Sequence, residues 1–349
     1  MSFKSQINHY RRTIMKALTG NIGNRFLAEK GKINPNFKIN RVLICRPNQR
    51  LGNTLLITPL IQEIITENPQ VVIDVFVKGR VAPIVFQNYS QVDQIIELPK
   101  KPFKDLINYI KVWVKIRDKK YDLAINVHQE SSSGRISTLV SRSKFKLFGD
   151  EFLSDPTALE QVHLAKMPVF QFRQFLKFVK GKTIATPYPI LNLNLSAAEI
   201  ATGRKLLDQV TKNSNKKTIA FFTYATGSKC YCTQWWDDLY EQVNPTLSEK
   251  YNLIEILPVE NISMLNRKLP TFYSKDVREI AAVMNNCELL VAADSGMMHL
   301  GVAAPTKTIG LFKAGLVDKY RPYGEGNDMV FVQDDNASKV VEKLKEKLN

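Results

Sequence analysis

Three polar residues interrupt an apolar run near the C-terminal end of the chain. Residues 289–293 have the composition of a buried strand, Asp294, Ser295 and Gly296 follow, and a helical pattern then begins at Met297. A strand, a tight polar turn and a helix start bring backbone N–H groups, a hydroxyl and a carboxylate together, which suits an anion. The plainer alternative is that Asp294 or Ser295 only caps the helix. His299 lies on the first turn of that helix, where it could bind a ligand or serve the structure alone.

A loop of small residues, Thr226-Gly227-Ser228-Lys229, follows another predicted strand over residues 218–224. Small residues let backbone N–H groups approach a phosphate, and Lys229 would add positive charge, although it could also be an ordinary loop lysine. The spacing Gly-x-x-x-x-Gly-Lys-[Ser/Thr] of a P-loop is absent. Glu260 lies just beyond a third predicted strand, over residues 251–258. Since parallel strands present ligand sites at their C-terminal ends, these groups are expected at one edge of a sheet.

The N-terminal half offers a second set of polar residues in equivalent positions. Arg50, Gly52 and Asn53 follow a predicted strand over residues 41–45, and His128 and Glu130 come at the end of another, over residues 121–127. Arg135 opens the next predicted helix. Asn53 could equally be a helix cap, and His128 and Glu130 could be solvated loop residues.

Predicted strands alternate with predicted helices along most of the chain, which indicates an α/β fold with parallel sheets covered on both faces. A chain of 349 residues is long enough for two domains. Thr186-Pro187-Tyr188-Pro189 excludes regular structure and marks the link between them. We expect a basic amphipathic extension over residues 1–34, one Rossmann-like domain over 35–190, a second over 191–335, and a C-terminal helix over 336–349.

The formal net charge of +16 is confined to one half of the chain. Residues 1–190 contain 30 Lys and Arg against 14 Asp and Glu, whereas residues 191–349 contain 19 of each. The basic half should therefore attract a polyanion, for which nucleic acid, an anionic membrane surface and a phosphorylated acceptor are the candidates. Nucleic acid is disfavoured because no recognised binding motif accompanies the charge. A basic surface that only maintains solubility is the plain alternative.

Several classes of protein are disfavoured by composition. The sequence has no apolar stretch long enough for a transmembrane helix, and its polar, basic N-terminus lacks the apolar core of a signal peptide. Four scattered cysteines fit a reduced, cytoplasmic setting. They and the four dispersed histidines do not form a zinc-binding pattern, so no metal is expected.

Two stretches carry a family resemblance. Residues 41–60, Arg-Val-Leu-Ile-Cys-Arg-Pro-Asn-Gln-Arg-Leu-Gly-Asn-Thr-Leu-Leu-Ile-Thr-Pro-Leu, resemble the opening of the ADP-heptose:lipopolysaccharide heptosyltransferase family, which is glycosyltransferase family 9. Residues 293–312 resemble that family's Asp-Ser-Gly-x-x-His-Leu segment with its later Pro-Thr. The two stretches have the family's order and separation, so the resemblance covers about residues 40–335.

The resemblance implies a GT-B fold, in which an acceptor domain precedes a nucleotide-sugar domain, and an inverting transfer without metal or cofactor. The acceptor would be an anionic glycolipid of the lipopolysaccharide core at the cytoplasmic face of the inner membrane, which agrees with the basic first half. Peripheral contact with that membrane is expected. Residues 1–34 could lie on the membrane surface or could pack onto the protein's own body. The donor-site residues that it implies, with Lys229 added, are Thr226, Gly227, Ser228, Lys229, Glu260, Asp294, Ser295, Gly296 and His299. Arg50, Gly52 and Arg135 are assigned to the acceptor.

The sequence departs from the family at two positions. Asn53 stands where many members have the aspartate proposed as general base, and an amide cannot take up a proton at neutral pH. We therefore predict that Glu130 or His128 replaces it in the catalytic group around Asn53. Thr233-Gln234 stands where members often have a lysine, so Lys229 is predicted to supply the cation for the phosphate. The alternative to an active enzyme is a catalytically silent relative that binds a sugar or a membrane.

Overall fold

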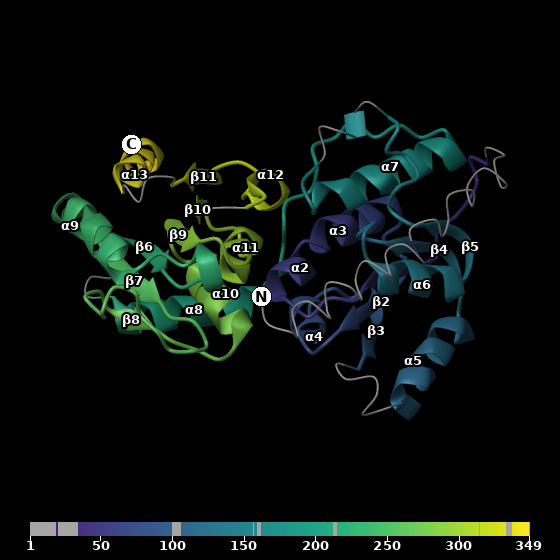
Figure 1. Ribbon diagram of the computed structural model, residues 1–349, viewed down its shortest axis with the longest axis horizontal. Coiled ribbons are helices and arrows are strands. Elements are labelled where there is room, and N and C mark those ends of the chain that lie inside the picture. The colour runs from purple at the N-terminus through teal and green to yellow at the C-terminus, as the bar shows by residue number, and fades with distance from the viewer. Residues whose placement is uncertain are drawn as a thin grey trace. The chain divides into compact units, whose positions relative to one another are not determined.

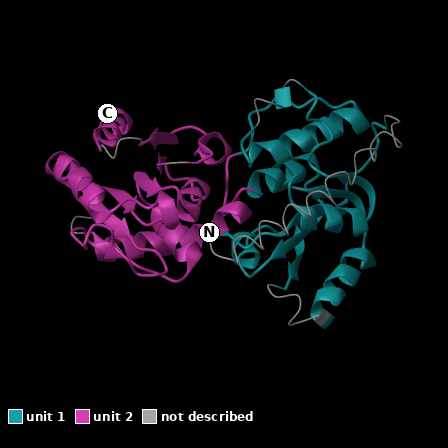
Figure 2. Cartoon of the chain, viewed as in Figure 1, with its two compact units in different colours: residues 1–50, 57–189 teal, residues 51–56, 190–349 magenta. Residues whose placement is uncertain are grey.

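The computed structural model describes Thr19 and residues 34–348, apart from residues 100–105, 156, 159–161, 212–214, 314 and 333–336. The described chain forms two compact units. One contains residues 57–189 and the described residues up to Arg50, and the other contains Leu51–Leu56 and Ile190 onward (Figure 2). Apart from Thr19 and residue 34, the predicted N-terminal extension lies outside the described residues.

The first unit has a five-stranded parallel sheet in the order β3-β2-β1-β4-β5 (Figure 1). Its central strand is β1, whose residues Val42 to Cys45 are completely buried, because a parallel sheet covered on both faces needs an unbroken apolar run. The strands are β1 (Arg41–Arg46), β2 (Val72–Lys78), β3 (Val92–Leu98), β4 (Lys120–Asn126) and β5 (Arg142–Leu147).

Helices α3 (Thr58–Glu67) and α7 (Lys166–Lys180) of the first unit pack against each other. A buried ion pair joins them, in which Arg173 Nε lies 2.6 Å from Glu63 Oε1. Arg173 also donates to the backbone carbonyls of Thr186 and Pro187, so it fixes the irregular segment that ends the unit. The remaining helices are α4 (Ala82–Val85), α5 (Leu106–Asp118) and α6 (Ser132–Val140).

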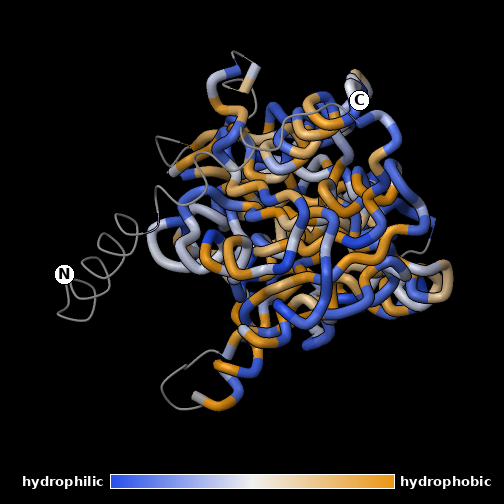
Figure 3. The backbone as a smooth tube through the Cα atoms, turned by 90° about the vertical axis from the view of Figure 1, so that its right-hand side faces the viewer, coloured by the Kyte–Doolittle hydropathy of each residue, from blue (hydrophilic) through white to orange (hydrophobic). Residues whose placement is uncertain are grey.

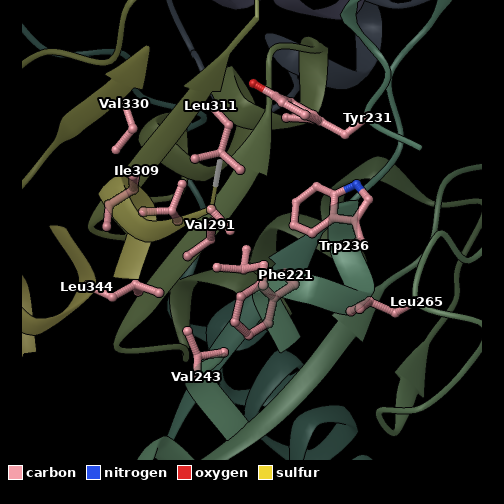
Figure 4. Packing of buried hydrophobic residues seen from close by; sticks show 14 of the residues in the cluster. Phe221, Tyr231, Trp236, Val243, Leu265, Val291, Ile309, Leu311, Val330 and Leu344 are labelled. Atoms are coloured by element: carbon pink, nitrogen blue, oxygen red, sulfur yellow. The ribbon is translucent and has the colours of Figure 1, made fainter. Parts of the chain in front are cut away.

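The second unit has a six-stranded parallel sheet in the order β11-β10-β9-β6-β7-β8. The strands are β6 (Lys217–Phe222), β7 (Tyr251–Ile256), β8 (Thr271–Phe272), β9 (Leu289–Ala293), β10 (Thr308–Phe312) and β11 (Asp328–Phe331). Side chains two residues apart on a strand point to the same face. Phe221, Val291, Ile309 and Leu311 therefore meet Trp236 and Val243 on one face, where they form part of its core (Figure 4).

Two helices of the second unit, α9 (Thr233–Lys250) and α13 (Ser338–Leu348), contribute to this core and pack on each other. A second group, α8 (Ala197–Val210), α10 (Val277–Asn285) and α11 (Gly296–Ala303), also packs together. The close approach of α11 to the sheet requires Gly301, since a Cβ there would lie 2.3 Å from Leu290 Cδ2. Two short helices complete the unit, α2 (Leu51–Leu55) and α12 (Val317–Tyr320). Figure 3 shows hydrophobic and hydrophilic stretches interspersed along the backbone.

The predicted α/β class with parallel sheets is confirmed. Residues 51–67 form two helices, because Pro59 has no N–H to continue the hydrogen bonding of α2 and instead occupies the first turn of α3. Strand β8 and helix α12 were not predicted, because two and four residues are too few to show a period.

The domain boundaries also differ from those expected. The chain passes from one unit to the other between Pro189 and Ile190, but Leu51–Leu56, placed by sequence in the first domain, belong to the second unit. Helix α13, which was expected as a C-terminal helix outside the second domain, contributes Val340 and Leu344 to the core of the second unit. Among the described residues, no helix combines the length and apolar composition that crossing a membrane requires.

Candidate functional site

Strands β6 and β9 of the second unit are neighbours, and the chain leaves them in opposite directions across the sheet. From β6 the chain continues to β7 and β8 on one side, and from β9 to β10 and β11 on the other. Phe222 and Ala292 pair near the C-terminal ends of the two strands. This is the point in an open parallel sheet at which ligands bind, because the two following loops diverge and leave a crevice. The loops are residues 223–229 and 294–295.

Ser295 caps the helix that follows β9. It has an extended backbone, and its Oγ accepts a hydrogen bond from the backbone N–H of Met297 at 3.3 Å. The plainer sequence interpretation, a capped helix, is therefore confirmed for Ser295. Asp294 is anchored as well, since its backbone N–H donates to Leu311 O at 3.0 Å. The N-terminus of α11, which begins directly after Ser295, carries the positive end of the helix dipole.

Lys229 and Asp294 form an ion pair between these two loops, with Nζ 2.5 Å from Oδ2. The Asp294 side chain is 8% exposed, while that of Lys229 is 42% exposed. The lysine on the β6 loop thus reaches the carboxylate after β9. The sequence predicted that both residues belong to one site, but it gave no distance between them.

Two aromatic rings complete the cluster. The Lys229 ammonium lies 5.7 Å from the centre of the Tyr320 ring, and the Tyr320 and His299 rings are 6.2 Å apart. His299 is 5% exposed. Tyr320 was not singled out by sequence. It lies in α12, a helix too short to predict, and only its tertiary contacts reveal it.

Gly52 lies against the start of α11. A Cβ at position 52 would be 2.8 Å from His299 Cδ2 and 3.3 Å from Gly296 Cα. A Cβ at position 296 would be 3.2 Å from the backbone nitrogen of Gly52. Two glycines therefore allow α2 and α11 to touch, which explains why Leu51–Leu56 belong to this unit. Gly52, expected at the acceptor, meets His299 and Gly296, expected at the donor.

The other predicted donor residues are exposed. Thr226, Gly227 and Ser228 lie at the surface, with Gly227 in the left-handed region at φ 66°, which glycine adopts without strain. They precede Lys229 in one short 3₁₀ turn, so they lie beside the ion pair. Glu260 is exposed in the turn that follows β7.

Glu255, on β7, is a buried acid that the sequence analysis missed. It is completely buried and accepts hydrogen bonds from Thr223 Oγ1 at 2.6 Å and from Ser263 Oγ at 2.5 Å. The backbone N–H of Met264 in turn donates to Thr223 Oγ1 at 3.3 Å. This network ties the end of β6 to the loop after β7, which includes Glu260. An acid inside the apolar run Leu253–Leu257 was the signal that could have revealed it.

The first unit has its own switch point between β1 and β4. Beyond β4, the Nδ2 group of Asn126 donates to the carbonyl of His128 at 2.9 Å, which holds the loop in place. Nδ1 of His128 accepts from the backbone N–H of Glu130 at 3.4 Å. With Nδ1 so engaged, a neutral imidazole carries its proton on Nε2. Glu130 is exposed on the same loop.

Arg135 is 2% exposed and is engaged within the protein. Its Nη1 lies 2.8 Å from Asp150 Oδ2, and its Nε donates to the carbonyl of Thr19 at 3.0 Å. This geometry favours a structural role over contact with an acceptor. Arg50, by contrast, is exposed at the end of the first unit's β1 loop, and its backbone N–H donates to Asn48 Oδ1. Asn53 is half-buried on α2 of the second unit.

Residues 275–349 match the model of glycosyltransferase family 9 (heptosyltransferase). The matched segment contains Asp294, Ser295, Gly296 and His299. This match supports the resemblance of residues 293–312 to that family, while residues 41–60 lie outside the matched segment. No curated protein matches the sequence.

Solved structures share the fold over nearly the whole chain. The glycosyltransferase family 9 protein from Veillonella parvula has a TM-score of 0.67 at 16% identity, covering 89% of this chain and 92% of its own. The E. coli ADP-heptose lps heptosyltransferase II has 0.65 at 17%, covering 88% and 98%. The E. coli heptosyltransferase WaaC with ADP has 0.66 at 15%, covering 88% and 99%. The fold is that of GT-B glycosyltransferases, as the sequence predicted.

Proposed function

We propose that this protein is a glycosyltransferase that transfers a sugar from a nucleoside diphosphate sugar to a lipopolysaccharide core acceptor. The observation that carries the proposal is the Lys229–Asp294 ion pair beside the capped start of α11. It lies at the switch point of the second sheet, and Asp294 falls within the family 9 segment. Heptose is the expected sugar and ADP the expected nucleotide, because the similar E. coli proteins are heptosyltransferases and one of them is complexed with ADP.

The residues of the second unit suit the leaving group of such a transfer. When the bond between the anomeric carbon and the phosphate oxygen breaks, negative charge builds on the diphosphate. The N-terminus of α11 and the Lys229 ammonium, held ready by Asp294, would stabilise that charge. Thr226, Gly227 and Ser228 precede Lys229 at the surface and would contact the phosphates, while Glu260 and His299 are the proposed contacts for the rest of the donor.

The acceptor hydroxyl must lose a proton as its oxygen attacks the anomeric carbon with inversion. Asn53 cannot accept it, so the base is another residue. We favour Glu130 over His128, because a neutral His128 with its proton on Nε2 offers a donor there instead of an acceptor. Asn53 would then hold the acceptor through its amide, together with Arg50 and the backbone at Gly52. Arg135 would support the loop of residues 128–131 instead of touching the acceptor.

The charge distribution supports an anionic acceptor. The first 190 residues contain the whole excess of positive charge, so a phosphorylated glycolipid would be drawn to them. Such an acceptor implies a peripheral position at the cytoplasmic face of the inner membrane. We expect the transfer to need neither metal nor cofactor, and we expect no nucleic acid partner.

The direct test is incubation with ADP-heptose and a truncated core acceptor, with detection of the glycosylated product. We expect Lys229→Met to lower turnover by about 100-fold, the scale typical of losing one group that stabilises developing charge. Lys339→Met, which changes an exposed lysine of α13 in the same unit, should leave turnover unchanged. Absence of product with the unaltered protein would favour a catalytically silent relative.

The base has its own test. Glu130→Gln should abolish most of the turnover but leave donor binding intact, because the base acts on the acceptor. Unchanged turnover of the Glu130→Gln protein would show that the base lies elsewhere.

A further inference from the structure

Helix α5 of the first unit has two apolar faces. One of them packs inward, where Tyr109, Val112, Trp113 and the fully buried Ile116 join the core formed by β1 to β4. The Trp113 ring lies 5.7 Å from that of Phe76 on β2. These contacts fix which side of α5 faces outward.

The outward face presents three branched apolar side chains in a row. Ile107 is 70% exposed, and Ile110 and Val114 are each 54% exposed. Their spacing of three and four residues places them on one side of the helix, so they form a continuous stripe. Single exposed apolar residues are common on proteins, but an adjacent set on one helix face usually marks an interaction site.

Basic residues flank the stripe on both sides. At 100° per residue around a helix, Lys111 and Lys115 follow it on one side and Arg117 on the other. All three are exposed, and Asp118 is the single acidic residue of α5. The surrounding half of the chain has a net charge of +16. Aliphatic side chains bordered by cations match an anionic lipid surface. The aliphatic side chains insert into it, and the cations contact the lipid phosphates.

We propose that the outward face of α5 binds the surface of an anionic phospholipid bilayer. Its three aliphatic residues enter the boundary between headgroups and acyl chains, and its lysines contact the lipid phosphates. A protein partner fits less well, since a stable protein interface needs some 20–30 residues a side and aromatic anchors, whereas Tyr109 and Trp113 pack inward. The proposal is independent of donor and acceptor, and it places the membrane contact on a described helix of the protein body.

The test is co-sedimentation of the full-length protein with vesicles. We expect binding to vesicles that contain phosphatidylglycerol, weakening with added salt, and little binding to pure phosphatidylcholine. The double change Ile107→Ser and Ile110→Ser should lower the partition coefficient by about 100-fold, at roughly tenfold for each partly inserted side chain. Lys111→Gln with Lys115→Gln should lower it by about 25-fold, at roughly fivefold for each lysine near the surface.

Val259→Ser is the matched control, because Val259 is 66% exposed but belongs to the second unit and not to α5. It should bind vesicles like the unaltered protein. Full binding by the Ile107→Ser, Ile110→Ser protein would overturn the proposal, as would equal binding to phosphatidylcholine vesicles. Concentration-dependent dimerisation that the same double change abolishes would show that the stripe instead binds a second copy.

The donor-induced rise in melting temperature should be the same in the Ile107→Ser, Ile110→Ser protein as in the unaltered one. This measurement confirms that the variant is folded, and it separates failure of the membrane proposal from failure of the glycosyltransferase proposal.

Discussion

Single residues explain how the loops around the candidate site are held. Glu255 accepts a hydrogen bond at each carboxylate oxygen from hydroxyls on two different segments. Because the carboxylate is completely buried, a group that cannot accept both bonds leaves a polar atom without a partner. Glu255 therefore fixes the relative position of Thr223 and Ser263, and through them the two loops that flank the proposed donor.

Glu255→Gln should lower the free energy of unfolding by about 1–3 kcal/mol, the cost of an unpaired buried polar group. The amide keeps the shape of the carboxylate but presents one donor group where an acceptor is needed. The measurement is urea unfolding, in which the midpoint should fall with an unchanged slope. Glu260→Gln, an exposed glutamate on the following turn, should change stability by less than about 0.5 kcal/mol. Equal effects of the two changes would contradict the role given to Glu255.

Predictability differs among the residues of the site. A cap at Asp294 or Ser295 was predicted, because Asp-Ser-Gly after an apolar run is a local signal, and the structure identifies Ser295 as the cap. Lys229 and Asp294 were foreseen individually, while their ion pair depends on β6 and β9 being neighbours. Tyr320 and Glu255 were missed, since one lies in a very short helix and the other's partners are distant in sequence.

At the scale of elements, the contact between α2 and α11 is the main departure from expectation. Sequence placed residues 51–56 with the first domain, since they directly follow its first strand. The structure places them with the second unit, where Gly52 and Gly296 approach closely. No local pattern signals this contact, because the absence of a side chain does not reveal which element will occupy the space.

Gly52→Ala tests that contact, because the free energy of unfolding should fall if the contact exists and rise if it does not. In an isolated helix, alanine is more stable than glycine by up to about 1 kcal/mol. In this contact the new Cβ would lie 2.8 Å from the His299 ring, so we expect destabilisation of about 1–3 kcal/mol and weaker donor binding. The measurements are the unfolding midpoint and the donor dissociation constant. A stabilised variant would show that α2 does not lie against α11 in solution.

The ion pair between Glu67 on α3 and Lys180 on α7 predicts how the free energy of unfolding changes as the pH falls. Burial alone would raise the pKa of Glu67, but the ammonium groups of Lys180 and Lys182 outweigh it and hold that pKa below its ordinary value of 4.5. A carboxyl group with a lowered pKa in the folded state contributes stability above its unfolded pKa, and this is lost as pH falls through the folded pKa.

Glu67→Gln should therefore reduce stability at neutral pH and flatten its decline below about pH 4.5. The measurement is the unfolding midpoint between neutral pH and the acid range. Asp155→Asn is the comparison, and its effect at neutral pH should be the smaller one, because the pKa of Asp155 is lowered mainly by hydrogen bonds from Thr157 at a solvent-accessible turn. A decline in acid that is identical in the Glu67→Gln and unaltered proteins would contradict this role for Glu67.

At the scale of the whole molecule, the two units differ in net charge and in proposed role. The chain has all of its excess positive charge in residues 1–190 and none in residues 191–349. The phosphate-binding candidates, Lys229 and the start of α11, lie in the neutral part. This division agrees with the proposed transfer, because a basic first unit would attract an anionic acceptor while the second unit is left for the donor.

The donor should stabilise the folded protein. A ligand that binds only the native state adds about 2.7 kcal/mol at a concentration 100-fold above its dissociation constant. We therefore expect ADP-heptose, and to a smaller extent ADP, to raise the melting temperature, with UDP-sugars having less effect. Lys229→Met should reduce the shift, and Lys339→Met should not. No shift with any ADP- or UDP-sugar would contradict the donor site.

The sequence by itself determined the α/β class, the separation of charge and the family resemblance, because these follow from short apolar runs, composition and local motifs. It also determined which turns follow strands, since an apolar run that stops at small polar residues is visible within a few positions. The tertiary structure alone decided which of those turns meet. The strand order β9-β6-β7 brings Lys229 to Asp294 and ties Thr223 to Glu255, and the contact between α2 and α11 brings Gly52 to His299. These contacts join residues far apart in the chain, and their partners are selected by packing of the whole sheet, which no local period encodes.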